Sequence, residues 1–213
     1  MKIGVLKETV SGESRVAATP ETVKKMIALS HSVSIEAGAG IQASISDEDY
    51  QNNGADIVSR DQALKSDLLL MVRPLSDKEI TTLKPTQFLV GMLEPFNNEL
   101  QNLLKKQGVS AFALEALPRN TRAQSMDVLS SQANIAGYKA VILAADYYKK
   151  FMPMLMTAAG TVKAAKVIVL GAGVAGLQAV ATAKRLGAVV EASDVRPSVQ
   201  EQIESLGGKF IEV

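Results

Sequence analysis

Three glycines at a fixed spacing are the residues of this sequence that point most clearly to chemistry. Gly171, Gly173 and Gly176 spell G-x-G-x-x-G directly after the apolar run Val167–Leu170, and Asp194 follows further along the chain. In a strand that runs into a helix, the first glycine permits a tight turn, the second lets the backbone approach a pyrophosphate, and the third allows close packing. The start of the helix offers free N–H groups and the positive end of its dipole to an anion. The segment therefore predicts a dinucleotide-binding turn.

An acidic residue after the second strand of such a unit can accept hydrogen bonds from the adenosine ribose hydroxyls. Asp194 has this position, because a helix predicted over 174–186 ends at Gly187 and a strand over Ala188–Ala192 follows. A carboxylate favours NAD(H) over a cofactor with a 2′-phosphate, although the neighbouring Arg196 weakens that inference. A glycine-rich turn that binds nothing is the alternative interpretation. The predicted cofactor-binding positions are Gly171, Ala172, Gly173, Val174, Ala175, Gly176, Asp194, Val195 and Arg196.

A second set of polar residues recurs along a long helix predicted from Ser125 to about Lys150. Because the spacings are three and four residues, these side chains share one face of the helix. Such a face could hydrogen-bond a carboxamide and a ribose, or it could cap the helix and meet solvent. The set consists of Asp127, Ser130, Ser131 and Asn134.

Short apolar runs alternate with amphipathic segments in the first half of the chain. This alternation predicts an α/β fold with a parallel sheet covered on both faces. Helices are expected over Pro20–Leu29, with Thr19 as its cap, and over Asn97–Gln107, ended by Gly108. The expected strands are Ile3–Leu6, Val33–Glu36, Asp56–Val58, Leu68–Val72, Phe88–Gly91 and Val109–Leu114.

These elements divide into two domains joined by the long helix. We expect a flavodoxin-like N-terminal α/β domain over 1–125, the connecting helix over 126–150, and a Rossmann domain over 151–213. The Rossmann domain opens with a linker, Met152–Ala165, and a strand, Lys166–Leu170, and it ends with a strand over Lys209–Val213. It has only the first βαβαβ half of a dinucleotide fold, so the chain is expected to belong to a longer subunit.

Composition excludes several classes of function. The chain has 213 residues, and its 23 basic and 22 acidic residues leave a net charge of +1, which gives no sign of nucleic-acid binding. Cysteine is absent, so disulfides, thiol catalysis and cysteine–metal sites are excluded. No metal site, membrane span or targeting segment is expected. The single histidine, His31, falls between a helix and a strand and is interpreted as a surface connector.

The chain resembles the alpha subunits of proton-translocating NAD(P) transhydrogenases, in their NAD(H)-binding domain. Three segments carry the resemblance: KETVSGESRVAATPETV, RAQSMDVLSSQANIAGYKAV and TAAGTVKAAKVIVLGAGVAGLQA. The resemblance implies hydride transfer between NAD(H) and NADP(H), with NADP(H) held on a partner domain. It also implies a membrane subunit that couples the reaction to proton translocation, a homodimer of alpha subunits, and a cytoplasmic location at the inner face of the plasma membrane.

The same resemblance implies roles for the loop before the long helix. Arg119 and Ser130 would hold the nicotinamide carboxamide, and Asp127 would lie with Arg119 near the ring and its ribose. Gln124 would reach toward the NADP(H) of the separate domain.

The wider superfamily includes alanine dehydrogenase, which is the main alternative. That enzyme uses a lysine and a histidine for proton transfer. Here LLLMVRPLSD offers Arg73 in place of the lysine, FLVGMLEPFNN has no histidine, and only Arg15, the substrate-carboxylate residue, is retained. Because an arginine stays protonated and is a poor base, this alternative is disfavoured, and Arg15 is expected to brace the N-terminal domain. A non-catalytic NAD-binding fragment is the remaining alternative.

Overall fold

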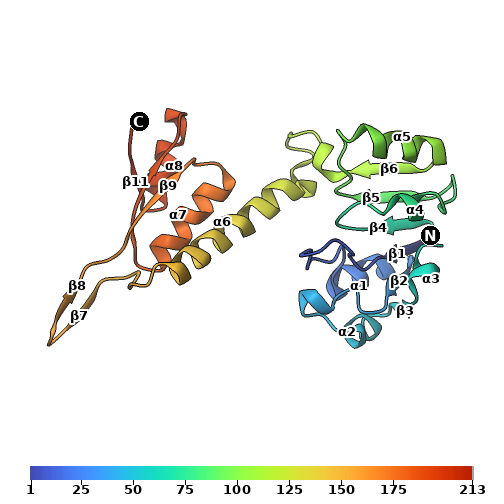
Figure 1. Ribbon diagram of the computed structural model, residues 1–213, viewed down its shortest axis with the longest axis horizontal. Helices are drawn as coiled ribbons and strands as arrows, with labels where there is room; N and C mark the ends of the chain where they lie inside the picture. Colours follow the sequence, from blue (N-terminus) through green and yellow to red (C-terminus); the bar gives the residue numbers. More distant parts are fainter. Residues whose placement is uncertain (213) are drawn as a thin grey trace. The chain divides into compact units, whose positions relative to one another are not determined.

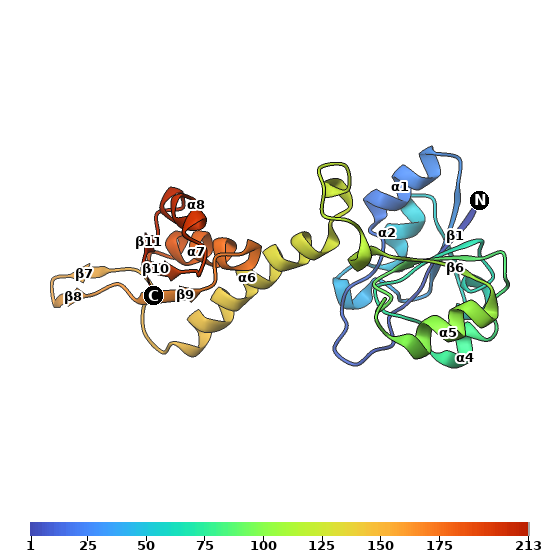
Figure 2. The same ribbon diagram turned by 90° about the horizontal axis from the view of Figure 1, so that it is seen from above.

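A computed structural model describes residues 1–212 and divides the chain into two compact units, Met1–Asp127 (unit 1) and Val128–Val213 (unit 2). Each unit has its own sheet and its own hydrophobic core. Figures 1 and 2 show both units as strands covered by helices. The expected α/β fold class is confirmed.

Unit 1 contains a sheet of six parallel strands in the order β3-β2-β1-β4-β5-β6. The strand order reverses between β1 and β4, the point at which open α/β sheets place their crevices. The strands are β1 (Lys2–Val5), β2 (Ser32–Glu36), β3 (Asp56–Val58), β4 (Leu68–Leu70), β5 (Phe88–Gly91) and β6 (Ser110–Ala113). The helices are α1 (Pro20–Ala28), α2 (Asp47–Asn52), α3 (Arg60–Ala63), α4 (Asp77–Ile80) and α5 (Asn98–Gln107).

Each face of this sheet packs against its own hydrophobic core, and successive side chains of a strand contribute to the two cores in turn because they point to opposite sides. Ile3 and Val5 belong to one core with Val33 and the ring of Tyr50, whereas Leu69 belongs to the other. Figure 2 shows α1 and α2 on one face and α4 and α5 on the opposite face. The predicted parallel sheet covered on both faces is therefore confirmed.

Local sequence signals place the two longest helices of unit 1. Thr19 caps α1, since its hydroxyl accepts a hydrogen bond from the Thr22 N–H and Pro20 begins the helix. Asn97 caps α5, and Gly108 ends it in the left-handed conformation with φ 72°. Both helices were predicted with these residues at their ends.

Three glutamates tie the carboxyl ends of neighbouring strands together in unit 1. Each carboxylate accepts hydrogen bonds from backbone N–H groups in the loop that follows the adjacent strand, so polar groups leaving the sheet are satisfied. The pairs are Glu36 with Lys7 (2.8 Å), Glu8 with Val72 and Arg73 (2.6 and 3.1 Å), and Glu115 with Leu93 and Glu94 (3.2 and 2.8 Å). Burial raises the pKa of Glu8, and its two backbone N–H donors oppose that shift.

Unit 2 begins with α6 (Val128–Tyr147), a little shorter than the helix predicted from Ser125, because a 3₁₀ turn occupies Gln124–Met126. Its sheet contains three parallel strands in the order β11-β10-β9. The strands are β9 (Lys166–Leu170), β10 (Val189–Ser193) and β11 (Lys209–Phe210), and the helices that follow β9 and β10 are α7 (Val174–Arg185) and α8 (Gln200–Ser205).

The linker expected over Met152–Ala165 is partly wrong. Leu155–Thr157 (β7) and Gly160–Val162 (β8) pair as an antiparallel hairpin, which is visible as an extended ribbon in Figure 1. Gly160, the first residue of β8, takes φ 137°, a backbone angle that glycine adopts without strain. The predicted strand Lys209–Val213 is found over Lys209–Phe210, and Val213 itself lies outside the described residues.

Candidate dinucleotide site

The three glycines of the loop between β9 and α7 differ in backbone angle and in the space around them. Gly171 lies in the left-handed region with φ 97°, and its N–H donates to the Ser193 carbonyl at 2.8 Å. A β-carbon at Gly176 would collide with the Gly171 carbonyl oxygen, so only glycine fits there. A β-carbon at Gly173 would meet nothing within 4 Å. The loop is thus tightly packed on its inner side and open at its middle glycine.

The open glycine caps a helix that has no side-chain partner at its start. Gly173 is the N-cap of α7 and makes no side-chain hydrogen bond there. The first N–H groups of an α-helix have no partner within the helix and attract anions. Val174 is exposed and Ala175 is half-buried, so these residues border the open side of the turn.

Asp194 lies beside this loop and is bonded to it. Its Oδ2 accepts a hydrogen bond from the Ala172 N–H at 2.7 Å, although 22 residues separate the two in sequence. The Arg196 side chain holds the pKa of the Asp194 carboxyl far below its usual range, and the backbone N–H groups of Arg196 and Ala172 add to that effect. Asp194 is therefore a fixed, negatively charged acceptor at the carboxyl end of β10.

A shallow cavity of about 310 Å³ opens next to the same carboxylate. Two apolar side chains flank it, Leu170 at 83% exposure and Val195 at 98% exposure. Gly171, Ser193 and Asp194 complete its lining. The carboxyl ends of β9 and β10 thus present an apolar surface and a carboxylate side by side, which suits an adenosine.

Gly137 of α6 positions the long helix against the glycine loop, and sequence reasoning missed it. A β-carbon at Gly137 would collide with the Ala175 carbonyl oxygen, so the two helix backbones lie in direct contact. Ser130, Asn134, Gly137 and Val141 recur at spacings of three and four, which places them along one stripe of α6. Gly137 and Val141 are buried, and Asn134 continues the stripe as an exposed amide. A glycine inside a predicted helix was the signal that could have identified this contact.

The residues expected at the nicotinamide belong to two different units. Arg119, Gln124 and Asp127 lie at the end of unit 1, and Ser130 lies in the first turn of α6 in unit 2. Arg119 and Gln124 are exposed, while Asp127 and Ser130 are half-buried. The stripe predicted to include Asp127 begins later than expected, because α6 starts only at Val128.

Hydrogen bonds within the loop order the segment that carries Arg119 and Gln124. The Asn120 side chain accepts from the Ala123 N–H at 2.9 Å, and Ala123 itself is buried. An asparagine that bonds its own backbone in this way forms a compact turn. The exposed side chains therefore project from a defined loop.

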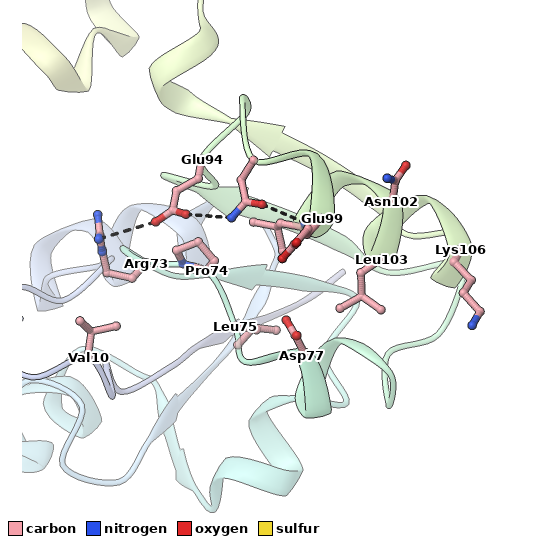
Figure 3. Close-up of a pocket in the computed structure, with 12 residues that line it drawn as sticks. Val10, Arg73, Pro74, Leu75, Asp77, Glu94, Glu99, Asn102, Leu103 and Lys106 are labelled. Atoms are coloured by element: carbon pink, nitrogen blue, oxygen red, sulfur yellow. Dashed lines mark hydrogen bonds and ion pairs between the residues drawn. The ribbon is translucent and has the colours of Figure 1, made fainter.

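A second cavity, of about 580 Å³, opens in unit 1 beside the loops after β4 and β5 and against α5 (Figure 3). Arg73 pairs with Glu94 at 3.7 Å, and the Asn97 amide donates to the same carboxylate at 3.3 Å. Figure 3 shows Lys106 at the opposite rim from Arg73. The position expected for a catalytic lysine in alanine dehydrogenase therefore carries a guanidinium, which cannot serve as a base.

Neither of the remaining candidates adds a catalytic group to this cavity. Arg15 bonds Glu13 in the same loop, with Nε and Nη2 at 2.7 and 2.6 Å from the two carboxylate oxygens. His31 lies in the turn between α1 and β2, and its Nδ1 is buried without a hydrogen-bond partner in the described residues.

Two further features are absent from the described residues, 1–212. No group of three or more His, Cys, Asp or Glu side chains there is arranged to hold a metal ion. No helix in the same range is long and apolar enough to span a membrane.

Comparison with known proteins identifies relatives along the whole chain. The chain is 50% identical to a Rhodospirillum rubrum polypeptide that is named as the first part of "NAD(P) transhydrogenase subunit alpha", over 221 aligned positions, which cover 100% of this chain and 58% of that polypeptide. It is 34% identical to "Alanine dehydrogenase 1" of Staphylococcus aureus, over 69% of this chain and 39% of that protein. The chain thus spans little more than half the length of the transhydrogenase polypeptide it matches.

Solved structures agree with these relatives. The transhydrogenase of Sinorhizobium meliloti matches with a TM-score of 0.96 and 50% identity, over 99% of this chain and 64% of that one. An L-alanine dehydrogenase matches with a TM-score of 0.87 and 29% identity, over 100% of this chain and 61% of that one.

Two family descriptions match consecutive segments of the sequence. "Alanine dehydrogenase/PNT, N-terminal domain" covers residues 4–136, and "Alanine dehydrogenase/PNT, C-terminal domain" covers residues 140–213. The chain therefore belongs to the alanine dehydrogenase/PNT family.

Proposed function

We propose that this chain is the NAD(H)-binding component of a transhydrogenase. Hydride passes between NAD(H) on this chain and NADP(H) on a partner domain, and a membrane subunit couples this transfer to proton translocation. Identity of 50% over the full chain with a transhydrogenase subunit, against 34% over 69% with an alanine dehydrogenase, supports this choice. The complete assembly would pair alpha subunits as a dimer at the inner face of the plasma membrane.

The observation that carries the proposal is the glycine loop with Asp194 bonded to it. The residues fit a dinucleotide, because Gly173 leaves open space at the start of α7, where an anion is favoured. The N–H groups at the start of α7 would hold the pyrophosphate. Asp194 would accept the adenosine ribose hydroxyls, and Leu170 and Val195 would flank the adenosine.

The nicotinamide end of the site is assigned to the loop before α6 and to the first turn of that helix. Arg119 and Ser130 would hold the carboxamide, Asp127 would lie near the ring and its ribose, and Gln124 would face the NADP(H) domain. Bound NAD(H) would supply the ring carbon that gives or accepts hydride. The task of these side chains is to orient the ring and to keep water away from it.

The proposed hydride transfer requires no general acid or base on this chain. Hydride transfer between two nicotinamides adds no proton to the reacting atoms and removes none. Alanine oxidation, in contrast, requires proton transfer at the amine. Arg73, which pairs with Glu94, carries a guanidinium, and a guanidinium is too poor a base to provide it.

Binding can be tested by titrating the chain with NADH and, separately, with NADPH, while nicotinamide fluorescence is followed. We expect saturable NADH binding and much weaker NADPH binding. Asp194→Ala should weaken NADH binding roughly ten- to hundred-fold, because hydrogen bonds from the ribose to a charged acceptor are lost. Glu201→Gln, which removes an exposed carboxylate of α8, is the control and should bind as wild type does. Equal affinity for NADH in wild type and Asp194→Ala would contradict the assignment.

Turnover requires the rest of the enzyme. The chain should be mixed with an NADP(H)-binding domain of a transhydrogenase, and NADPH should then reduce an NAD⁺ analogue of shifted absorbance. Arg119→Ala should slow this transfer more than it weakens NADH binding to the isolated chain. L-alanine with NAD⁺ is the matched assay for the alternative, and NADH formation there would favour the dehydrogenase.

A further inference from the structure

The carboxylate that is proposed to bind the adenosine ribose already has a hydrogen-bond donor on each of its acceptor sites. Oδ1 of Asp194 accepts from the Arg196 backbone N–H and from Arg196 Nε, both at 2.9 Å. Oδ2 accepts from the Ala172 N–H at 2.7 Å and from Arg196 Nη2 at 3.0 Å. An ionised carboxylate has about four lone-pair sites on its two oxygens. All four are therefore occupied.

The four donors fall into two pairs with different roles. The Ala172 and Arg196 backbone N–H groups belong to the glycine loop and to the turn after β10, so they hold the carboxylate in place whatever the Arg196 side chain does. The guanidinium donates one N–H to each oxygen, which is the bidentate geometry of arginine with a carboxylate. Only this second pair can leave without moving the backbone.

A ribose diol would donate to the same carboxylate in the same manner. Its two neighbouring hydroxyls present two donors to the two oxygens, as the guanidinium does. The Asp194 side chain is only 7% exposed, while the Arg196 side chain is 57% exposed, so the guanidinium is on the solvent side of the pair. Diol and guanidinium therefore compete for one acceptor.

We propose that Arg196 is a specificity-determining residue, whose guanidinium occupies the ribose-binding oxygens of Asp194 and is displaced when the dinucleotide binds. This inference rests on the proposed binding of NAD(H). Displacement costs affinity for NAD(H). The released guanidinium lies within two residues of Asp194 and can pair with a 2′-phosphate, so it lowers discrimination against NADP(H).

The test compares dissociation constants of the full chain for NADH and NADPH in wild type and Arg196→Ala. We expect Arg196→Ala to bind NADH two- to five-fold more tightly, the range of an exposed ion pair. We expect it to bind NADPH no more tightly than wild type does, so that selectivity for NADH rises. Arg185→Ala, which removes an exposed positive charge from the last turn of α7, is the control for net charge. It should leave the ratio of the two constants unchanged.

Two further NADH titrations, one with Arg196→Gln and one at raised salt, test whether the guanidinium competes with the ribose for Asp194. Glutamine keeps the aliphatic stem but has no charged fork, so it should tighten NADH binding as alanine does. Salt weakens the ion pair, so the gain from Arg196→Ala should shrink as ionic strength rises. Circular dichroism of each variant shows whether unit 2 is folded.

The possible outcomes are distinct. Weaker or unchanged NADH binding by a folded Arg196→Ala, with intact binding by wild type, would overturn the competition while leaving the proposed function standing. Absence of NADH binding by wild type would overturn the proposed function and, with it, this inference.

Discussion

Gly137 in α6 packs directly against the Ala175 carbonyl oxygen in α7, with no room between them for a β-carbon. Ala175 is the second residue of α7 and lies inside the glycine motif. The helix that follows the predicted nicotinamide loop is thereby fixed against the start of the predicted pyrophosphate-binding helix. The position of Ser130 relative to the glycine loop is set by the packing of α6 against α7, to which this close contact belongs.

Gly137→Ala should destabilise unit 2. In an exposed helix interior, replacing glycine by alanine stabilises a protein by about 1 kcal/mol. Here the added methyl group meets a carbonyl oxygen and should instead cost about 1–3 kcal/mol, as overpacking does. Urea unfolding followed by circular dichroism measures the change, and Lys139→Ala on the exposed side of α6 is the control. An increase in stability would contradict the close packing.

Gly173→Ala and Gly176→Ala should separate binding from folding. A methyl group at Gly173 meets nothing within 4 Å, and the residue has φ −75°, so the fold should be unaffected. The same methyl group should lower NADH affinity roughly tenfold or more, because it stands where the pyrophosphate approaches. At Gly176 a methyl group collides with the Gly171 carbonyl and should lower stability by about 1–3 kcal/mol.

Thermal unfolding measures the effect of each glycine substitution on stability, and NADH titration measures its effect on binding. The expected pattern is a normal melting temperature with weak binding for Gly173→Ala, and a lowered melting temperature for Gly176→Ala. Normal NADH binding by Gly173→Ala would show that the pyrophosphate does not approach the loop at that residue.

Sequence reasoning predicted the elements of the fold because local signals set them. Thr19, Pro20 and Gly108 define helix ends through hydrogen bonds and backbone angles of nearby residues, so they are readable without tertiary information. The hairpin over 155–162 was missed because Met, Thr, Ala and Gly side chains give no clear period there. The two strands of the hairpin are joined by backbone hydrogen bonds, which the side-chain pattern does not reveal.

The site was predictable only in part, for a similar reason. The roles of Gly171 and Gly176 follow from their spacing after a strand, and the structure agrees with them. Contacts between elements distant in sequence were not predictable, as with the bond from the Ala172 N–H to Asp194. The bidentate pair of Arg196 with Asp194 depends on the path of the turn after β10. The hydrophobic pattern of the sequence does not predict that path.

NADH binding should be independent of the titration of Asp194 near neutral pH. The Arg196 side chain and two backbone N–H groups hold the pKa of this carboxyl far below its usual range in the free chain. The two backbone N–H donors remain when a dinucleotide displaces the guanidinium, so the carboxyl stays ionised in both states. A lowered folded-state pKa contributes stability above the unfolded value of about 3.9 and loses it as pH falls below that value. We therefore expect the contribution of Asp194 to NADH affinity to be constant between about pH 5 and 8.

Comparison of wild type with Asp194→Asn isolates this effect. The difference in stability between the two should shrink below about pH 4, where the unfolded chain takes up a proton that the folded chain resists. An Asp194-dependent step in NADH affinity near pH 6 would show that the carboxyl is not held by the bonds described.

Glu8→Ala should destabilise unit 1 although Glu8 belongs to no helix or strand. Its carboxylate accepts from the Val72 and Arg73 N–H groups at 2.6 and 3.1 Å, and these donors follow β4 at the centre of the sheet. Removing the acceptor leaves two partly buried N–H groups unpaired. Each of them that finds no new partner should lower the free energy of unfolding by about 1–3 kcal/mol. Urea unfolding should show this loss. Glu21→Ala, which breaks an exposed ion pair with Lys25, should leave the stability almost unchanged. Equal effects of the two substitutions would mean that water replaces the Glu8 carboxylate without cost, and that the loop after β4 is held by other contacts.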